Sequence, residues 1–90
     1  MELFYIYLLR TCEDTIYTGQ TADLKRRLKE HRAGQGGHYT SARLPVELEY
    51  YETAASRSKA MQREREIKEM TRGEKELLIV NGPGKRHDGP

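Results

Sequence analysis

Two tripeptides near the start of the chain carry side chains that suit chemistry on a phosphate ester. They are Tyr5-Ile6-Tyr7 and Tyr17-Thr18-Gly19, and Arg27 and His31 follow within the next segment. A phenol orients a water or, when its pKa is lowered, accepts its proton. An arginine fork binds two phosphate oxygens, and a histidine transfers protons near neutral pH. The set favours phosphodiester binding and cleavage, and cross-strand packing of the tyrosines is the alternative.

Helical spacing predicts where the two basic side chains lie. Arg27 and His31 are four residues apart, so they share one helix face. They flank the apolar stripe of Leu24 and Leu28, which is expected to face the sheet, and they should therefore reach the sheet edge that carries the tyrosines. The other basic residues of this helix lie further out, where a solvated basic face is the alternative to nucleic-acid contact.

Glu64 stands out in a later helix for a different reason. Ala60, Glu64 and Ile67 follow the spacing i, i+4, i+7, so Glu64 lies on or beside an apolar helix face. A buried carboxylate is costly unless it is paired or bound to a metal. The pattern predicts a ligand for one divalent ion, Mg²⁺ or Mn²⁺, and an internal salt bridge, for example to Arg27, is the alternative.

Composition limits the protein to one small domain with a heavily charged surface. The chain has 90 residues, of which 33% are charged and 36% hydrophobic, and its formal net charge is +2. A chain of this length supports one domain. Residues 25–32 hold five Lys or Arg and one Glu, whereas residues 47–52 hold three Glu and no basic residue. This asymmetry predicts one basic face.

Cysteine count and hydropathy predict the compartment. Cys12 is the single cysteine, which excludes an internal disulfide and suits a reducing environment. The apolar run from Leu3 to Leu9 is too short for a membrane span and is wrongly flanked for a signal peptide. We expect a soluble cytoplasmic protein with no membrane partner.

Apolar periodicity and turn residues predict the order strand, strand, helix, strand, helix, helix. Strands are expected over residues 3–9, 14–18 and 46–52, and helices from a cap at Thr21 or Asp23 to about Arg32, from Ser56 or Ser58 to about Met70, and from a capping box at Thr71 to Asn81. Gly19 is expected to end the second strand, at a turn or a close-approaching phosphate. In the third strand Val46, Leu48 and Tyr50 alternate with Glu47, Glu49 and Tyr51.

These elements predict an α+β fold, a small three-stranded antiparallel or mixed sheet flanked by three helices. Residues 1–81 form the single domain. Residues 82–90 contain three glycines and two prolines and are expected to be a disordered tail.

The chain resembles the GIY-YIG nuclease domain superfamily, and within it the small stand-alone proteins of the UPF0213 group. Tyr5-Ile6-Tyr7 and Tyr17-Thr18-Gly19 stand at the two motifs that name the family, and the resemblance covers roughly residues 4–81. The stretches 37–40, 45–48 and 66–68 look like the UPF0213 group specifically. Tyr5 replaces the first glycine of the family motif.

The resemblance implies roles for individual residues. Catalytic roles fall on Tyr7, Tyr17, Arg27 and His31, and the metal-binding role falls on Glu64. Which tyrosine is the base stays open. The residues expected to contact nucleic acid are Gly19, Lys25, Arg26, His38, Tyr39 and Asn81, of which Asn81 is alternatively a helix cap and His38 and Tyr39 alternatively loop residues.

The resemblance also implies an activity, a metal-dependent endonuclease that hydrolyses phosphodiester bonds in DNA. No targeting domain is visible in the sequence, so we expect little sequence specificity or selection of flaps, branches or single strands. A homodimer or a targeting protein partner is a further source of target choice, and RNA is the alternative substrate. The competing hypotheses are a nucleic-acid-binding module that hardly cuts and a structural adaptor.

Overall fold

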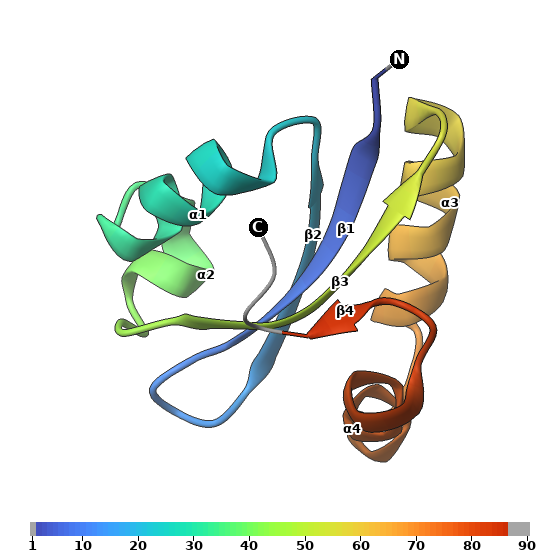
Figure 1. Ribbon diagram of the computed structural model, residues 1–90. Helices are drawn as coiled ribbons and strands as arrows, with labels where there is room; N and C mark the ends of the chain where they lie inside the picture. Colours follow the sequence, from blue (N-terminus) through green and yellow to red (C-terminus); the bar gives the residue numbers. More distant parts are fainter. Residues whose placement is uncertain (1, 87–90) are drawn as a thin grey trace.

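The computed structural model describes residues 2–86 as one antiparallel sheet with helices on both faces (Figure 1). The strand order is β2-β1-β3-β4. The strands are β1 (Phe4–Arg10), β2 (Ile16–Thr21), β3 (Glu47–Ala54) and β4 (Lys85–Arg86), and the helices are α1 (Leu24–Arg32), α2 (His38–Ser41), α3 (Arg57–Lys68) and α4 (Arg72–Asn81). The predicted α+β class is confirmed. Within residues 2–86, no helix is long and apolar enough to cross a membrane.

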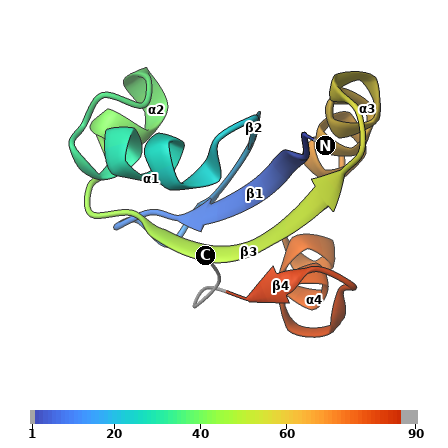
Figure 2. The same ribbon diagram turned by 45° about the horizontal axis from the view of Figure 1, so that its top comes forward.

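The central strand β1 is buried on both faces because its apolar residues alternate between two cores. Ile6 and Leu8 pack beneath α3 and α4, and Tyr7 and Leu9 pack beneath α1. Figures 1 and 2 show the first helix pair on one side of the sheet and the second pair on the other. The sequence of a strand that is covered on both sides is a nearly continuous apolar run, and the sequence of β1 has this pattern.

Helix starts follow the predicted capping residues. The side chain of Asp23 accepts a hydrogen bond from the Arg26 amide at the start of α1. Ser56 caps α3 in the same way, and Thr71 and Glu74 form the predicted capping box at α4. These side chains satisfy amides that the first helical turn leaves unpaired.

A bulge in β3 redirects its side chains. Leu8 pairs with Tyr50 and Leu9 pairs with Leu48, so Glu49 has no partner of its own. Tyr50 therefore packs in the core beneath α3, whereas Leu48 packs beneath α1. The alternation of Leu48 and Tyr50 in the sequence suggested a shared face, and that expectation was wrong because one extra residue reverses the alternation beyond it.

Two short elements were missing from the sequence-based prediction. The one-turn helix α2 follows the glycine-rich loop, and β4 pairs with Tyr50 and Tyr51 at the outer edge of β3. The segment 82–86 was expected to be disordered, and instead the Gly84 amide donates to Tyr50 Oη at 2.9 Å. Residues 87–90 of the expected tail lie outside the described residues.

The docking of β4 requires a glycine at position 84. A Cβ atom there would overlap the Tyr51 carbonyl and lie 2.8 Å from the Tyr50 ring. We expect Gly84→Ala to lower the free energy of unfolding by about 1–3 kcal/mol, as overpacking does. The matched control is Gly73→Ala in α4, where a Cβ meets only Thr71 Oγ1 at 4.0 Å. Urea unfolding tests this, and equal stability of the two variants would contradict the tight fit.

Candidate active site

A buried hydrogen-bonded chain links three elements beneath α1. Tyr7 Oη lies 2.9 Å from His31 Nε2, and His31 Nδ1 lies 2.9 Å from Thr40 Oγ1. The side chains come from β1, α1 and α2, and each residue is at most 1% exposed. The Tyr7 phenol and His31 ring thus have fixed partners at both ends, which sets their orientation.

Two glycines make space for this chain. Gly19 pairs with Tyr7 across β1 and β2, and a Cβ at Gly19 would lie 2.5 Å from Tyr7 Oη. A Cβ at Gly36 would overlap the His31 ring. Gly19 was expected to end β2 or to admit a phosphate. It lies within β2 instead, and the space above it holds the Tyr7 ring.

Tyr17 lies over the buried pair and remains partly open to solvent. Its ring centroid is 6.4 Å from that of Tyr7 and 5.4 Å from that of His31. Tyr17 pairs with Leu9 in the β1–β2 ladder, so its side chain points to the same sheet face as Tyr7. The structure therefore brings the two tyrosine rings together on one sheet face, and Tyr17 is the more exposed residue of the two.

Arg27 borders the same cluster and is one-third exposed. Its guanidinium donates to Glu30 Oε1 at 2.9 Å and to the Gly36 carbonyl at 3.1 Å. These bonds hold the planar group with part of its surface open to solvent. A guanidinium presented in this way can bind two oxygens of an incoming phosphate.

Burial keeps the inner pair neutral at pH 7. Desolvation raises the pKa of Tyr7 to about 12, although the nearby Arg27 charge opposes the rise. Burial, reinforced by Arg27, lowers the pKa of His31 to about 4. An uncharged imidazole donates through one nitrogen and accepts through the other, which suits a relay between two hydroxyls.

Glu64 lies beside the apolar face of α3, as the helical spacing predicted. Ala60 and Ile67 are fully buried, and the Glu64 side chain is 20% exposed. Its carboxylate lies 3.3 Å from Lys68 Nζ, so the ion-pair alternative holds with Lys68 rather than with Arg27. The Glu64 charge also contributes, as a minor cause, to the raised pKa of Tyr7, which places it near the cluster.

Strand β2 has two unpartnered side-chain oxygens on the side of the sheet that faces α3. Residues 2–86 contain no group of three His, Cys, Asp or Glu side chains that could hold a metal. Thr18 and Gln20 flank Gly19 and pair with the two β1 residues that face α3, and their side-chain oxygens Thr18 Oγ1 and Gln20 Oε1 are buried without a hydrogen-bond partner. One carboxylate with neutral oxygens and water suits Mg²⁺ or Mn²⁺.

The remaining predicted contact residues separate into three groups. Lys25 and Arg26 are exposed on α1, and His38 is exposed on α2. Tyr39 stacks on Tyr17 with ring centroids 6.0 Å apart and joins the cluster. Asn81 is the last residue of α4, on the opposite side of the sheet, so the structure does not bring it to the cluster.

Sequence reasoning missed the part played by α2. Thr40 anchors the His31 ring from a segment that was expected to be an irregular loop. Arg43 packs its guanidinium 3.9 Å from the centroid of the Tyr39 ring and so supports the stack on Tyr17. No apolar periodicity marks this four-residue helix, and the glycines before it are the one local signal of a tight approach.

Removing the Thr40 hydroxyl should destabilise the protein. Thr40→Val keeps the shape but leaves His31 Nδ1 buried without a partner, and we expect a loss of about 1–3 kcal/mol in the free energy of unfolding. Thr40→Ser should retain most of the stability. Ser41→Ala is the matched control, because the Ser41 hydroxyl is on the exposed side of α2. A Thr40→Val protein as stable as Ser41→Ala would contradict the buried bond.

The lowered pKa of His31 predicts how stability depends on pH. The unfolded histidine takes up a proton near 6.5, whereas the folded one resists until about 4. The contribution of neutral His31 to the free energy of unfolding is therefore complete above pH 6.5, and it is lost as the pH falls toward 4. Unfolding free energies measured across this window should fall less steeply for His31→Gln than for wild type. The exposed-site control His38→Gln should keep the wild-type slope, and equal slopes for all three proteins would contradict the prediction.

Comparison with known proteins finds a matching domain family and similar sequences. Residues 3–76 match the GIY-YIG catalytic domain. A UPF0213 protein from Natronomonas pharaonis is 48% identical over 80 residues, which cover 89% of this chain and 94% of that protein. One from Bacillus pumilus is 45% identical over 75 residues, covering 83% of this chain and 76% of that protein.

A solved structure extends the likeness to three dimensions. The solution NMR structure of a UPF0213 protein from Bacillus halodurans has 36% sequence identity and a TM-score of 0.58, and the match covers 90% of this chain and 87% of that one. The matched domain, the related sequences and the shared fold agree. The chain belongs to the GIY-YIG family, and within it to the UPF0213 group.

Proposed function

We propose that this protein is a metal-dependent endonuclease that hydrolyses phosphodiester bonds in DNA. The observation that carries the proposal is the layered cluster: the partly exposed Tyr17 and Arg27 border the buried pair of Tyr7 and His31. Mere binding of nucleic acid does not require this buried, fully hydrogen-bonded support. Membership of the GIY-YIG family adds to the argument.

Accessibility divides the roles among the four residues. Tyr17 is the partly exposed tyrosine, so it would orient the attacking water and, as the phenolate, receive its proton. Arg27 would bind the phosphate oxygens and stabilise the negative charge that grows on them. Tyr7 and His31 are at most 1% exposed, so they would act through their neighbours and not by touching the substrate.

Glu64 would hold one Mg²⁺ or Mn²⁺ together with water and phosphate oxygens, and the unpartnered oxygens of Thr18 and Gln20 are candidate further donors. The ion would supply Lewis acidity at the scissile phosphate. Lys68 is more than half exposed, so its ammonium is able to leave Glu64 for solvent when a cation binds.

The exposed basic residues of α1 favour a nucleic-acid substrate. Lys25 and Arg26 are exposed beside Arg27 on a helix with no acidic residue in its first turn. Contacts of this kind bind phosphates without reading sequence, so selection would rest on strand structure, on a homodimer or on a protein partner.

Cys12 is an exposed free thiol, which supports a reducing, cytoplasmic location.

Cleavage of labelled single-stranded, duplex and branched DNA in Mg²⁺ or Mn²⁺ tests the proposal. We expect Tyr17→Phe to lower the cleavage rate by about 10²–10⁴-fold, the range typical of a lost general base. Ser58→Ala is its control, because it removes an exposed hydroxyl of α3 that lies outside the cluster. Glu64→Gln should abolish metal-dependent cutting, and Glu66→Gln at an exposed position of α3 should not.

Three results would argue against this assignment. Cleavage that survives chelation of divalent ions would remove the metal role. Equal cleavage rates for Tyr17→Phe and Ser58→Ala would remove the role of the Tyr17 phenol. Salt-dependent binding of every substrate without cutting would favour a nucleic-acid-binding module instead.

A further inference from the structure

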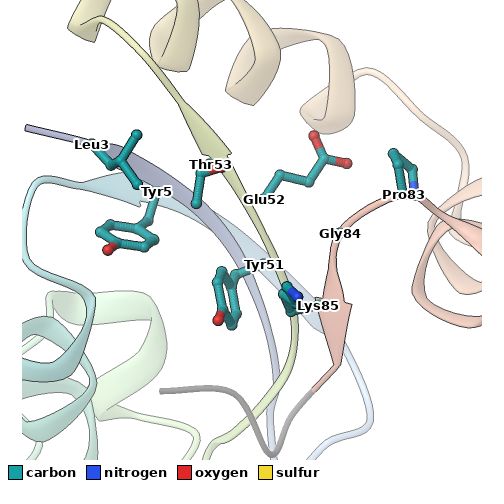
Figure 3. Close-up of a pocket in the computed structure, with 8 residues that line it drawn as sticks. All are labelled: Leu3, Tyr5, Tyr51, Glu52, Thr53, Pro83, Gly84 and Lys85. Carbon is teal, nitrogen blue, oxygen red and sulfur yellow. The ribbon is translucent and has the colours of Figure 1, made fainter.

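A groove beside the candidate active site has a different chemical character. Its volume is about 400 Å³, and it lies where the ends of β1 and β3 meet the segment before β4 (Figure 3). Leu3, Tyr5, Tyr51 and Thr53 line it from the sheet, and Lys85 lines it from β4. It is an apolar, aromatic groove with a cation at one edge.

The two tyrosines in this groove are available for contact. Their rings meet edge to face, with centroids 5.9 Å apart and planes at 61°. Both rings also pack against the edge of the core beneath α1. Both residues are partly exposed, and within residues 2–86 neither phenol makes a hydrogen bond to another side chain or to the backbone.

The groove lies next to the cluster around Tyr7 on the same face of the sheet. Tyr51 is the direct partner of Tyr7 in the β1–β3 ladder, and Tyr5 precedes Tyr7 by two residues on the same strand face. Two residues of a strand span about 6.6 Å. A ligand in the groove is thus a short step along the sheet from Tyr7, on the face that carries Tyr17.

Charge in the groove favours an anionic ligand. Lys85 is exposed, and within residues 2–86 it forms no ion pair. Glu52 also borders the groove, but its side chain points toward α3, where Arg63 Nε lies 2.8 Å from Glu52 Oε1 (Figure 3). The acidic side chain is therefore already neutralised, and the free charge at the groove is positive.

We propose that this groove binds an unpaired nucleobase of the substrate strand, close to the scissile phosphate. The base stacks on Tyr51 or Tyr5, and Lys85 contacts the adjoining phosphate. Exposed aromatic rings beside a cation bind single strands in this way, because every base has a flat face. The inference rests on the proposed function and adds a preference for unpaired nucleotides at or next to the cut.

Binding of a short single-stranded oligodeoxythymidylate tests the groove without cleavage. Fluorescence anisotropy is measured in chelator, so that no metal-dependent cutting occurs. We expect Tyr51→Leu and Tyr5→Leu each to weaken binding by about 10-fold, within the range for loss of one stacked base. The matched control is Phe4→Leu, which changes an aromatic residue of the same strand on the opposite face. Thermal unfolding confirms that each variant is folded.

The contribution of Lys85 is measured through salt. Lys85→Gln should lower the slope of log affinity against log salt by about one, as loss of one phosphate contact does. Lys59→Gln, on the exposed surface of α3, should leave the slope unchanged.

An abasic nucleotide placed at successive positions of the oligonucleotide locates the stacked base. In wild type, one position should be most sensitive to loss of the base. In Tyr51→Leu or Tyr5→Leu that sensitivity should disappear, because the missing ring and the missing base remove the same contact. Additive losses would overturn the inference.

The outcomes separate this inference from the proposed function. If Tyr51→Leu and Tyr5→Leu bind the oligonucleotide as wild type does while Tyr17→Phe still abolishes cleavage, the groove assignment fails and the nuclease stands. If wild type binds no oligonucleotide at any salt concentration and cuts no DNA, both fail. Weakened binding in the groove variants together with wild-type binding by Phe4→Leu supports the inference.

Discussion

The hydrogen-bonded chain from Tyr7 through His31 to Thr40 is the constraint on which the site depends. Each of its atoms is withdrawn from water, so every partner must be in place or a polar group is left unpaired at a cost. Strand β1 and helices α1 and α2 can therefore meet in only one arrangement. The same arrangement fixes the position of Tyr17 and Arg27 at the surface, so these two partly exposed residues rest on the buried hydrogen-bonded chain.

The cluster combines two residues that are withdrawn from water with two that stay partly exposed to it. Tyr7 and His31 are kept neutral by burial, which suits a rigid support. Tyr17 and Arg27 stay partly open, as the proposed contact with water and phosphate requires. Gly19 and Gly36 allow the two layers to lie in contact, since any side chain there would displace the inner pair.

Sequence signals within a single segment correctly predicted features that depend on that segment alone. The Asp23 cap, the Thr71 capping box and the place of Glu64 beside an apolar helix face were all correct. Features that depend on contacts between distant segments were missed or wrong. The face of Tyr50 depends on a bulge set by pairing with β1, and the role of Gly19 depends on a ring from the neighbouring strand. No periodicity within a single segment records such contacts.

The sheet separates two cores that share only its strands. One core lies between the sheet and α1, and the other lies between the sheet and the α3–α4 pair. Mutations in cores without shared side-chain contacts tend to act independently. Exposed positions of α4 are therefore open to sequence drift or redesign that leaves the chain of Tyr7, His31 and Thr40 untouched. Leu77 and Val80, exposed on α4, are positions at which a new surface could evolve without altering the core beneath α1.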